Sequence, residues 1–223
     1  MVHRDARRRG TPLGGGPVKI DRVVTSGTFS LDGGTWDVDN NVWLLGDDQD
    51  VLVIDAAHDA DAIAEAVGSR NVVAILCTHG HNDHVTVAPE LSTRLDAPIL
   101  LHPADDPLWR MTHPDVDYRS LADTPRITVG GTDIDILHTP GHSPGSVSLH
   151  LPEAAALFTG DTLFSGGPGA TGRSYSDFGT IIDSIRDRLL TLPDETTVHT
   201  GHGDTTTIGA EKPSLADWIA RGH

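Results

Sequence analysis

The stretch THGHNDH, residues 78–84, holds three histidines and one aspartate within the six positions from His79 to His84. It begins at the end of the run NVVAILCTH, residues 71–79, whose apolar part is typical of a strand buried on both faces. His79 and His81 are two positions apart just past that strand, so in an extended loop their rings can point the same way. Asp83 and His84 are adjacent and better placed to reach a second ion. The run predicts a metal site rather than a solvated polar loop.

The residue types of this run indicate which metals it would hold. Imidazole nitrogen with some carboxylate oxygen suits zinc, and it also accepts iron or manganese. Structural zinc sites usually rely on cysteine ligands, but the only cysteine, Cys77, lies in the apolar strand and is expected to be a small core residue. The run therefore favours a catalytic site that keeps one coordination position open.

Three further residues of ligand type follow β-like runs later in the chain. His142 lies in HTPGHSPGS, Asp161 in LFTGDTLF and His202 in HTGHGDTTTIG. A glycine adjoins each of them, and glycine lets the backbone turn tightly and approach an ion. With the opening run they make seven ligand-type residues, enough for two ions.

The hydrophobic pattern predicts strands first, then strands and helices in alternation, twice over. This order suggests two mixed sheets faced by helices in one domain, residues 18–223, after a flexible leader at 1–17. The segment 103–125, rich in Pro and Asp, is expected to be irregular. The expected strands are 18–24, 40–47, 50–55, 71–79, 98–102, 127–142, 146–151, 154–161 and 196–202, and the expected helices are 58–70, 87–96, 178–192 and 214–220.

Composition excludes several classes of protein. No stretch approaches the roughly 18 apolar residues that a membrane span needs. The net charge of −16 disfavours a nucleic-acid partner, because phosphate binding needs a clustered basic surface. The arginines near the N-terminus have no apolar segment after them, so a secretory signal is not expected. We therefore expect a cytoplasmic protein that acts on a small molecule; the oligomeric state is left open.

The ordered motifs resemble one known family. The run THGHNDH, then TPGHSPGS, GDTLF and GHG, is similar to the metallo-β-lactamase fold superfamily, and within it to the glyoxalase II-like (hydroxyacylglutathione hydrolase-like) hydrolases. The resemblance spans about residues 18–212. The chain ends about twenty residues after His202, so it resembles the short, single-domain relatives. The implied fold is α/β (α+β), a four-layer αββα sandwich with the site at one edge between the sheets.

The same resemblance implies a ligand set for two divalent metal ions, zinc in the first instance. His79, His81 and His142 would bind the first ion, Asp83, His84 and His202 would bind the second, and Asp161 would bridge the pair. Asp83 is also a candidate for proton transfer. Asp55, at the end of the run VLVID, matches a position that often orients a metal-binding histidine from behind.

Such a pair of ions implies a hydrolase. Two metals about 3.5–4 Å apart lower the pKa of a bridging water enough to give hydroxide near neutral pH. A thiolate leaving group needs little acid assistance, because thiols ionise at a pKa of about 8.5. The resemblance to the glyoxalase II-like enzymes therefore implies hydrolysis of an acyl thioester of a small thiol.

Other activities of the same superfamily stay open. A persulfide dioxygenase would use one iron, held here by His79, His142 and Asp161. A lactonase or another ester hydrolase would need the same metals. A β-lactamase is disfavoured because Asp161 stands where a bridging carboxylate is expected, and RNA-processing members are disfavoured by the acidic charge. A purely structural metal site is disfavoured because four ligands would suffice for it.

Two segments are candidates for the substrate pocket. In the segment 165–179, Arg173 and Ser174 keep part of the run that the family carries after its bridging aspartate, and Tyr175 and Phe178 are possible pocket residues, although packing is at least as good an interpretation. Trp36 adjoins DVDNN, residues 37–41, which is expected to be a loop near the site. We favour core or turn packing for Trp36 over a place in the pocket wall.

Overall fold

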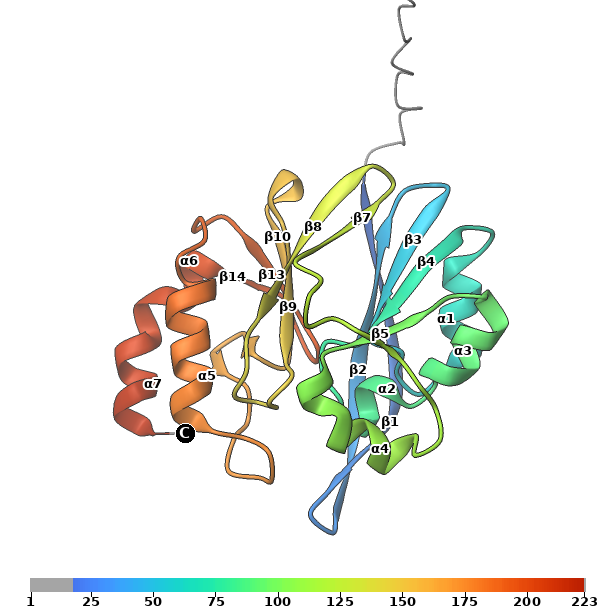
Figure 1. Ribbon diagram of the computed structural model, residues 1–223. Coiled ribbons are helices and arrows are strands. Elements are labelled where there is room, and N and C mark those ends of the chain that lie inside the picture. The colour runs from blue at the N-terminus through green and yellow to red at the C-terminus, as the bar shows by residue number, and fades with distance from the viewer. Residues whose placement is uncertain (1–17, 223) are drawn as a thin grey trace, which may run out of the picture.

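Two six-stranded β-sheets pack against each other with helices on their outer faces, in a computed structural model that describes residues 18–222 (Figure 1). The predicted leader at 1–17 lies outside the described residues. The predicted class, two mixed sheets flanked by helices in four layers, is confirmed. None of the described helices is long and apolar enough to cross a membrane.

The first sheet runs in the order of the sequence, from β1 to β6. Its first three strands are antiparallel, and β3, β4, β5 and β6 are parallel. Ile75 and Cys77 pack toward the outer helices, whereas Ala74 and Leu76 pack between the sheets, so β4 is buried on both faces as predicted. The strands are β1 (Lys19–Leu31), β2 (Gly34–Gly46), β3 (Asp50–Ile54), β4 (Asn71–Leu76), β5 (Ile99–Leu101) and β6 (Arg119–Ser120).

The second sheet has the order β14-β13-β10-β9-β8-β7. Only the pair β10 and β13 is parallel among its described strand pairs. A short hairpin of β11 (Leu163–Phe164) and β12 (Gly167–Pro168) forms a separate two-stranded sheet, and β11 contacts β10 and β13 of the second sheet. The strands are β7 (Arg126–Val129), β8 (Thr132–His138), β9 (Val147–Leu151), β10 (Ala156–Gly160), β13 (Thr197–Thr200) and β14 (Thr206–Thr207).

Three apolar clusters hold the layers together. One lies between the sheets and includes Leu76 and Phe158, one lies under α1 and α3, and one lies under α5, α6 and α7. Helix α1 begins where the Asp59 side chain accepts a hydrogen bond from the Ala62 amide, and it ends at Gly68. The helices are α1 (Ala60–Val67), α2 (Asn82–Val85), α3 (Ala88–Leu95), α4 (Asp106–Thr112), α5 (Phe178–Ser184), α6 (Ile208–Glu211) and α7 (Leu215–Arg221).

The structure corrects two sequence-based expectations. The strands expected at 18–24 and 40–47 belong to a longer hairpin, because β1 pairs with β2 along its whole length up to a turn at Asp32 and Gly33, both with positive φ. DVDNN therefore lies in a strand, not in a loop. The segment 103–125 contains helix α4, which begins with Asp106 and Pro107, and proline is favourable in a first helical turn.

The ends of four strands position the candidate site. Asp55 follows β3, and Thr78 and His79 follow its parallel neighbour β4. In the other sheet, Asp161 follows β10, and the segment with His202 follows its parallel neighbour β13. Carboxyl ends of parallel strands lie at the same edge of a sheet. The two packed sheets thus bring both edges to one end of the sandwich.

Candidate metal centre

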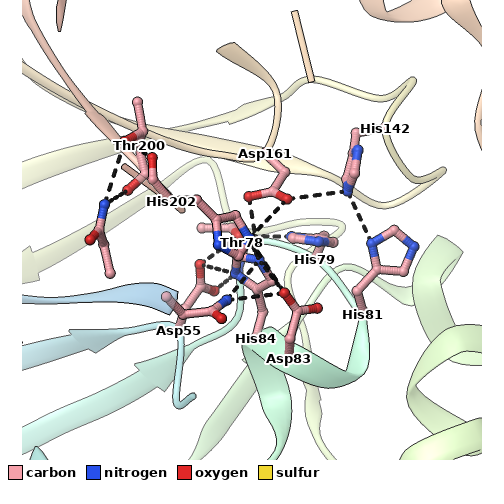
Figure 2. A network of polar contacts seen from close by, with 12 residues as sticks. Asp55, Thr78, His79, His81, Asp83, His84, His142, Asp161, Thr200 and His202 are labelled. Carbon is pink, nitrogen blue, oxygen red and sulfur yellow. Dashed lines mark hydrogen bonds and ion pairs between the residues drawn. The ribbon is translucent and has the colours of Figure 1, made fainter. Parts of the chain in front are cut away.

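The structure brings all seven predicted ligand residues together at the end of the sandwich (Figure 2). Their ligand atoms form three groups, and within each group the atoms lie within 4.8 Å of one another. The groups are His79, His81 and His142; Asp83, His84 and His202; and His79, His84 and Asp161. The division into two triads is the one expected for two neighbouring ions.

Asp161 lies between the two triads. Its Oδ2 atom is 3.5 Å from His142 Nε2 and 3.4 Å from His202 Nε2. Its Oδ1 atom is 3.3 Å from His84 Nε2. One carboxylate thus contacts members of both triads, as a bridging ligand would have to do (Figure 2).

Three imidazoles are oriented by acceptors outside the cluster. The Nδ1 atom of His84 lies 2.9 Å from Asp55 Oδ2, that of His142 lies 2.9 Å from the Ala170 carbonyl oxygen, and that of His202 lies 2.7 Å from the Asp39 carbonyl oxygen. Each acceptor favours the tautomer with hydrogen on Nδ1, so each Nε2 lone pair faces the cluster. Metal-binding histidines are usually held in this way.

Asp55 also supports His79 through Thr78. The Thr78 hydroxyl donates to Asp55 Oδ2 over 2.9 Å and lies 3.1 Å from His79 Nδ1. The Thr78 amide donates to Asp55 Oδ1 over 2.7 Å. A single buried carboxylate therefore fixes one histidine of each triad.

The pKa values of the histidines differ between the two triads, because carboxylates lie closer to the second one. Burial, with neighbouring imidazoles, holds the pKa of His79 well below its ordinary value and lowers the pKa of His81 to about 3. Burial also acts to lower the pKa of His84 and His202, but the neighbouring carboxylates, chiefly Asp161 and then Asp83, together outweigh it. They raise the pKa of His84 well above its ordinary value and that of His202 to about 10. The acidic side of the cluster thus stabilises positive charge.

The donor set fits divalent metal ions. Buried polar atoms without a hydrogen-bond partner among the described residues include His79 Nε2, His81 Nε2 and Asp83 Oδ1. An unsatisfied buried polar atom costs about 1–3 kcal/mol, so native proteins rarely keep several side by side. Imidazole nitrogens and carboxylate oxygens without thiolate suit zinc, iron or manganese.

The backbone approaches the ligands so closely that two positions require glycine. A Cβ atom at position 160 would overlap the Thr78 hydroxyl. At Gly201 it would overlap Asp161 Oδ1 and lie 2.8 Å from His84 Cε1. The glycines next to the ligands therefore serve close approach, as the sequence predicted.

Asn40 is a site residue that the sequence did not reveal. Its amide nitrogen donates to Asp83 Oδ2 over 3.1 Å, and its Oδ1 atom lies 2.9 Å from His58 Nε2. The residue is fully buried in β2. Asn40 and the carbonyl groups of Asp39 and Ala170 carry no sequence signal, because their partners are distant in the chain.

A cavity of about 260 Å³ opens beside the cluster. The Arg173 guanidinium carbon lies 3.8 Å from the centroid of the Trp36 ring and 5.4 Å from that of Phe29. The Asp32 carboxylate accepts a hydrogen bond from the Ser174 amide over 3.0 Å, which joins the β1–β2 hairpin to the segment 170–176. The lining residues are Phe29, Trp36, Val38, His81, Asp83, His142, Asp161, Ala170, Arg173, Ser174, Ser176 and His202.

The lining of the cavity shows which of the predicted pocket residues belong to it. Trp36 is 41% exposed and lines the cavity, so the preference for core packing was wrong. Arg173 and Ser174 line it as well, whereas Tyr175 is exposed outside it and Phe178 packs against the core beneath α5. Cys77 is fully buried, as expected for a core residue.

Comparisons with known proteins agree with this geometry. The model of the metallo-beta-lactamase superfamily matches residues 35–202. Hydroxyacylglutathione hydrolase GloC of Haemophilus influenzae is 34% identical over 192 residues, covering 78% of this chain and 90% of that protein. The structure of TTHA1623 in a di-iron-bound form is 33% identical, with a TM-score of 0.71 over 78% of this chain and 93% of that one. The B3 metallo-beta-lactamase BLEG-1 is 30% identical, with a TM-score of 0.69 over 85% and 97%.

Proposed function

Because the chain belongs to the metallo-beta-lactamase superfamily, we propose that it is a binuclear metal-dependent hydrolase that cleaves the acyl thioester of a small thiol. The observation that carries the proposal is the position of Asp161 between two triads of ligand-type residues. A structural metal site would need four ligands, and a single-ion site would leave one triad without a role.

The chain offers a complete ligand set for two ions. In this proposal His79, His81 and His142 hold one ion, Asp83, His84 and His202 hold the other, and Asp161 contacts both. When bound, two such ions polarise a carbonyl group and lower the pKa of a bound water. We propose zinc as the metal, although the di-iron form of TTHA1623 is a reason to measure it.

The protein residues prepare this site in three ways. Asp55 and the carbonyl groups of Asp39 and Ala170 hold the imidazoles in one tautomer and direction. Asn40 holds one oxygen of Asp83, and the other oxygen of Asp83 stays without a hydrogen-bond partner among the described residues. That free oxygen supports the proposed part of Asp83 as a ligand of the second ion.

The thioester is favoured over other acyl substrates by two considerations. The related GloC is named as a hydrolase of hydroxyacylglutathione, which is a thioester of a small thiol. A thiolate leaving group also needs little acid assistance, because thiols ionise at a pKa of about 8.5.

The cavity wall has the chemistry to bind the thiol carrier. Phe29 and Trp36 present apolar faces, and Arg173 is the one lysine or arginine in the lining. No carboxylate of the described residues lies within 4.0 Å of the Arg173 guanidinium, so it is available for a ligand. We propose that a carboxylate of the thiol carrier binds there.

Metal analysis combined with a substrate panel tests the function. The purified protein and its Asp161→Ala variant are assayed for metal content and for thiol release from acyl thioesters. Matched oxygen esters, lactones and a β-lactam are assayed separately as alternative substrates. We expect two metals per chain and thioester turnover that is lost in the variant.

Three results would contradict the proposal. One iron per chain with oxygen uptake on a persulfide would identify a dioxygenase. Faster turnover of lactones or oxygen esters would identify another esterase, and turnover of the β-lactam alone would identify a β-lactamase.

A further inference from the structure

Asp105 is a buried carboxylate that joins the two loops of the first triad. It lies just after β5, and its residue is 0% exposed. Its Oδ2 atom accepts hydrogen bonds from the Gly80 amide over 2.7 Å and from the Ser143 hydroxyl over 2.6 Å. Its Oδ1 atom accepts one from the Gly145 amide over 2.5 Å.

The donors of these bonds adjoin the ligand residues of one triad. Gly80 lies between His79 and His81, and Ser143 follows His142. Across the two loops, His81 Nδ1 is 3.0 Å from His142 Nε2. The Asp105 carboxylate therefore lies behind both loops at the place where their imidazoles converge.

Close packing shows that both loops are fitted to this side chain. A Cβ atom at position 145 would lie 2.7 Å from Asp105 Cγ, and one at position 80 would lie 3.1 Å from Asp105 Cβ. Any larger residue at Gly145 would force Asp105 and the loop apart. The fit fixes both the direction of the loops and the distance between them.

The charge of Asp105 has no basic partner in the part of the chain that the structure describes. No lysine, arginine or histidine nitrogen of residues 18–222 lies within 4.0 Å of its carboxylate. A buried carboxylate without a paired cation is unfavourable unless it is fully hydrogen-bonded. Three short bonds from loops that carry metal-ligand residues indicate that its task is to hold those loops.

The second triad is held by other groups. His84 is fixed by Asp55, His202 by the Asp39 carbonyl group and Asp83 by Asn40. None of these three residues donates a hydrogen bond to Asp105. Asp105 therefore supports the loops of the first triad only, whereas Asp55 reaches one histidine of each triad.

We propose that Asp105 is a positioning residue that sets the spacing of the loops bearing His81 and His142 and thereby the affinity of the first ion site alone. The inference rests on the proposed two-ion function. Asparagine has the shape of aspartate, but one of its two terminal groups is an NH2 donor, which cannot accept from an N–H or O–H group. The variant Asp105→Asn therefore loses at least one of the three bonds.

Two variant backgrounds allow zinc binding to be measured at one ion site at a time. The variant His202→Ala keeps the triad of His79, His81 and His142, and the variant His81→Ala keeps the triad of Asp83, His84 and His202. Zinc is titrated into each metal-free protein against a chromophoric chelator, with and without Asp105→Asn. We expect the Kd for zinc to rise about 10-fold to 100-fold in the His202→Ala background, the range seen when support of a metal ligand is lost. We expect no change in the His81→Ala background.

Two further variants guard against a general loss of stability. Ser143→Ala removes one hydrogen bond to Asp105 and keeps the Asp105 carboxylate, so it should raise the Kd for zinc in the His202→Ala background less strongly. If Asp105→Asn does not fold, this variant tests the inference in its place. Glu211→Gln is the matched control, because Glu211 is a buried carboxylate that accepts bonds from Thr206 and Gly166 away from the cluster. It should leave the Kd unchanged in both backgrounds.

The inference is overturned if the Kd rises equally in both backgrounds, if it rises in neither, or if the His202→Ala protein binds no zinc. Failure of the proposed function gives a different result. A wild-type protein that binds two ions but hydrolyses no thioester would contradict the thioesterase proposal and leave the role of Asp105 intact.

Discussion

Asp55 and His84 form a fully buried pair, with Asp55 Oδ2 2.9 Å from His84 Nδ1. The pair joins the end of β3 to helix α2, 29 residues apart in the sequence. Through Thr78 the same carboxylate also reaches His79. Asp55 thus supports a histidine of each triad from behind the cluster.

Replacing Asp55 by Asn should weaken binding of both ions. Asp55 accepts bonds from His84 and from the Thr78 hydroxyl at Oδ2 and from the Thr78 amide at Oδ1. Asparagine has a single accepting oxygen and cannot accept all three, so the support of the imidazoles is weakened. We expect the Kd for zinc to rise about 10-fold to 100-fold at each site without loss of binding. Titration against a chelator in the His202→Ala and His81→Ala backgrounds measures both values. An effect confined to the His81→Ala protein, which keeps the triad with His84, would show that Thr78 holds His79 without Asp55.

Replacing Gly201 by Ala should damage the site from the backbone side. The new methyl group would overlap Asp161 and press on His84. Overpacking of this kind costs about 1–3 kcal/mol, and here the strain falls on the residue between the triads. We expect a lower free energy of unfolding in denaturant titrations and fewer than two metals per chain. Gly179→Ala is the control, because a Cβ there makes only an ordinary contact, at 3.5 Å. Full metal content in Gly201→Ala would contradict the close approach.

The sequence predicted the residues that carry an unusual chemical signal. The ligand-type residues were found because histidines and aspartates that follow apolar strands are rare in combination. Helix α1 was predicted because an Ala-rich run with apolar residues at Ile63 and Val67 stops at Gly68, and the helix does end there. The fold class followed from the order of strands and helices, which local patterns determine.

The missed features depend on partners far away in the sequence. The three donors to Asp105 lie 25, 38 and 40 residues from it, and the segment around Asp105 resembles a loop in composition. The hairpin arms near Trp36 contain Asp and Asn, which favour turns locally, but cross-strand pairing keeps them extended. The conformation of these residues is determined by tertiary contacts, which no local sequence pattern indicates.

His199 should make stability depend on pH. Its ring stacks on Phe158 and meets the edge of Trp43, and burial lowers its pKa from 6.5 to about 4. Above pH 6.5 neither the folded nor the unfolded state is protonated there. Between pH 6.5 and about 4 the unfolded chain takes up a proton that the folded protein does not, so stability falls as the pH falls.

Replacement of His199 by Phe tests this dependence. The variant keeps an aromatic ring on Phe158 but cannot titrate. We expect the free energy of unfolding of the metal-free protein to fall less steeply in the variant than in the wild type between pH 6.5 and 4. Urea titrations at several pH values measure it. Parallel curves for the two proteins would show that His199 does not contribute.

Replacing Arg173 by Met should change substrate choice without changing the metal centre. Methionine can keep the apolar packing over Trp36, but it removes the only lysine or arginine from the lining of the cavity. A hydrogen bond to a charged group contributes about 1.5–3 kcal/mol, so kcat/KM should fall about 10-fold to 100-fold for thioesters whose thiol carries a carboxylate. Thioesters of an uncharged thiol with the same acyl group should react as in the wild type, and the metal content should stay at two per chain. An equal loss on both substrates would mean that Arg173 supports the hairpin against the segment 170–176 rather than binding the carboxylate, since that contact shapes the cavity for every substrate.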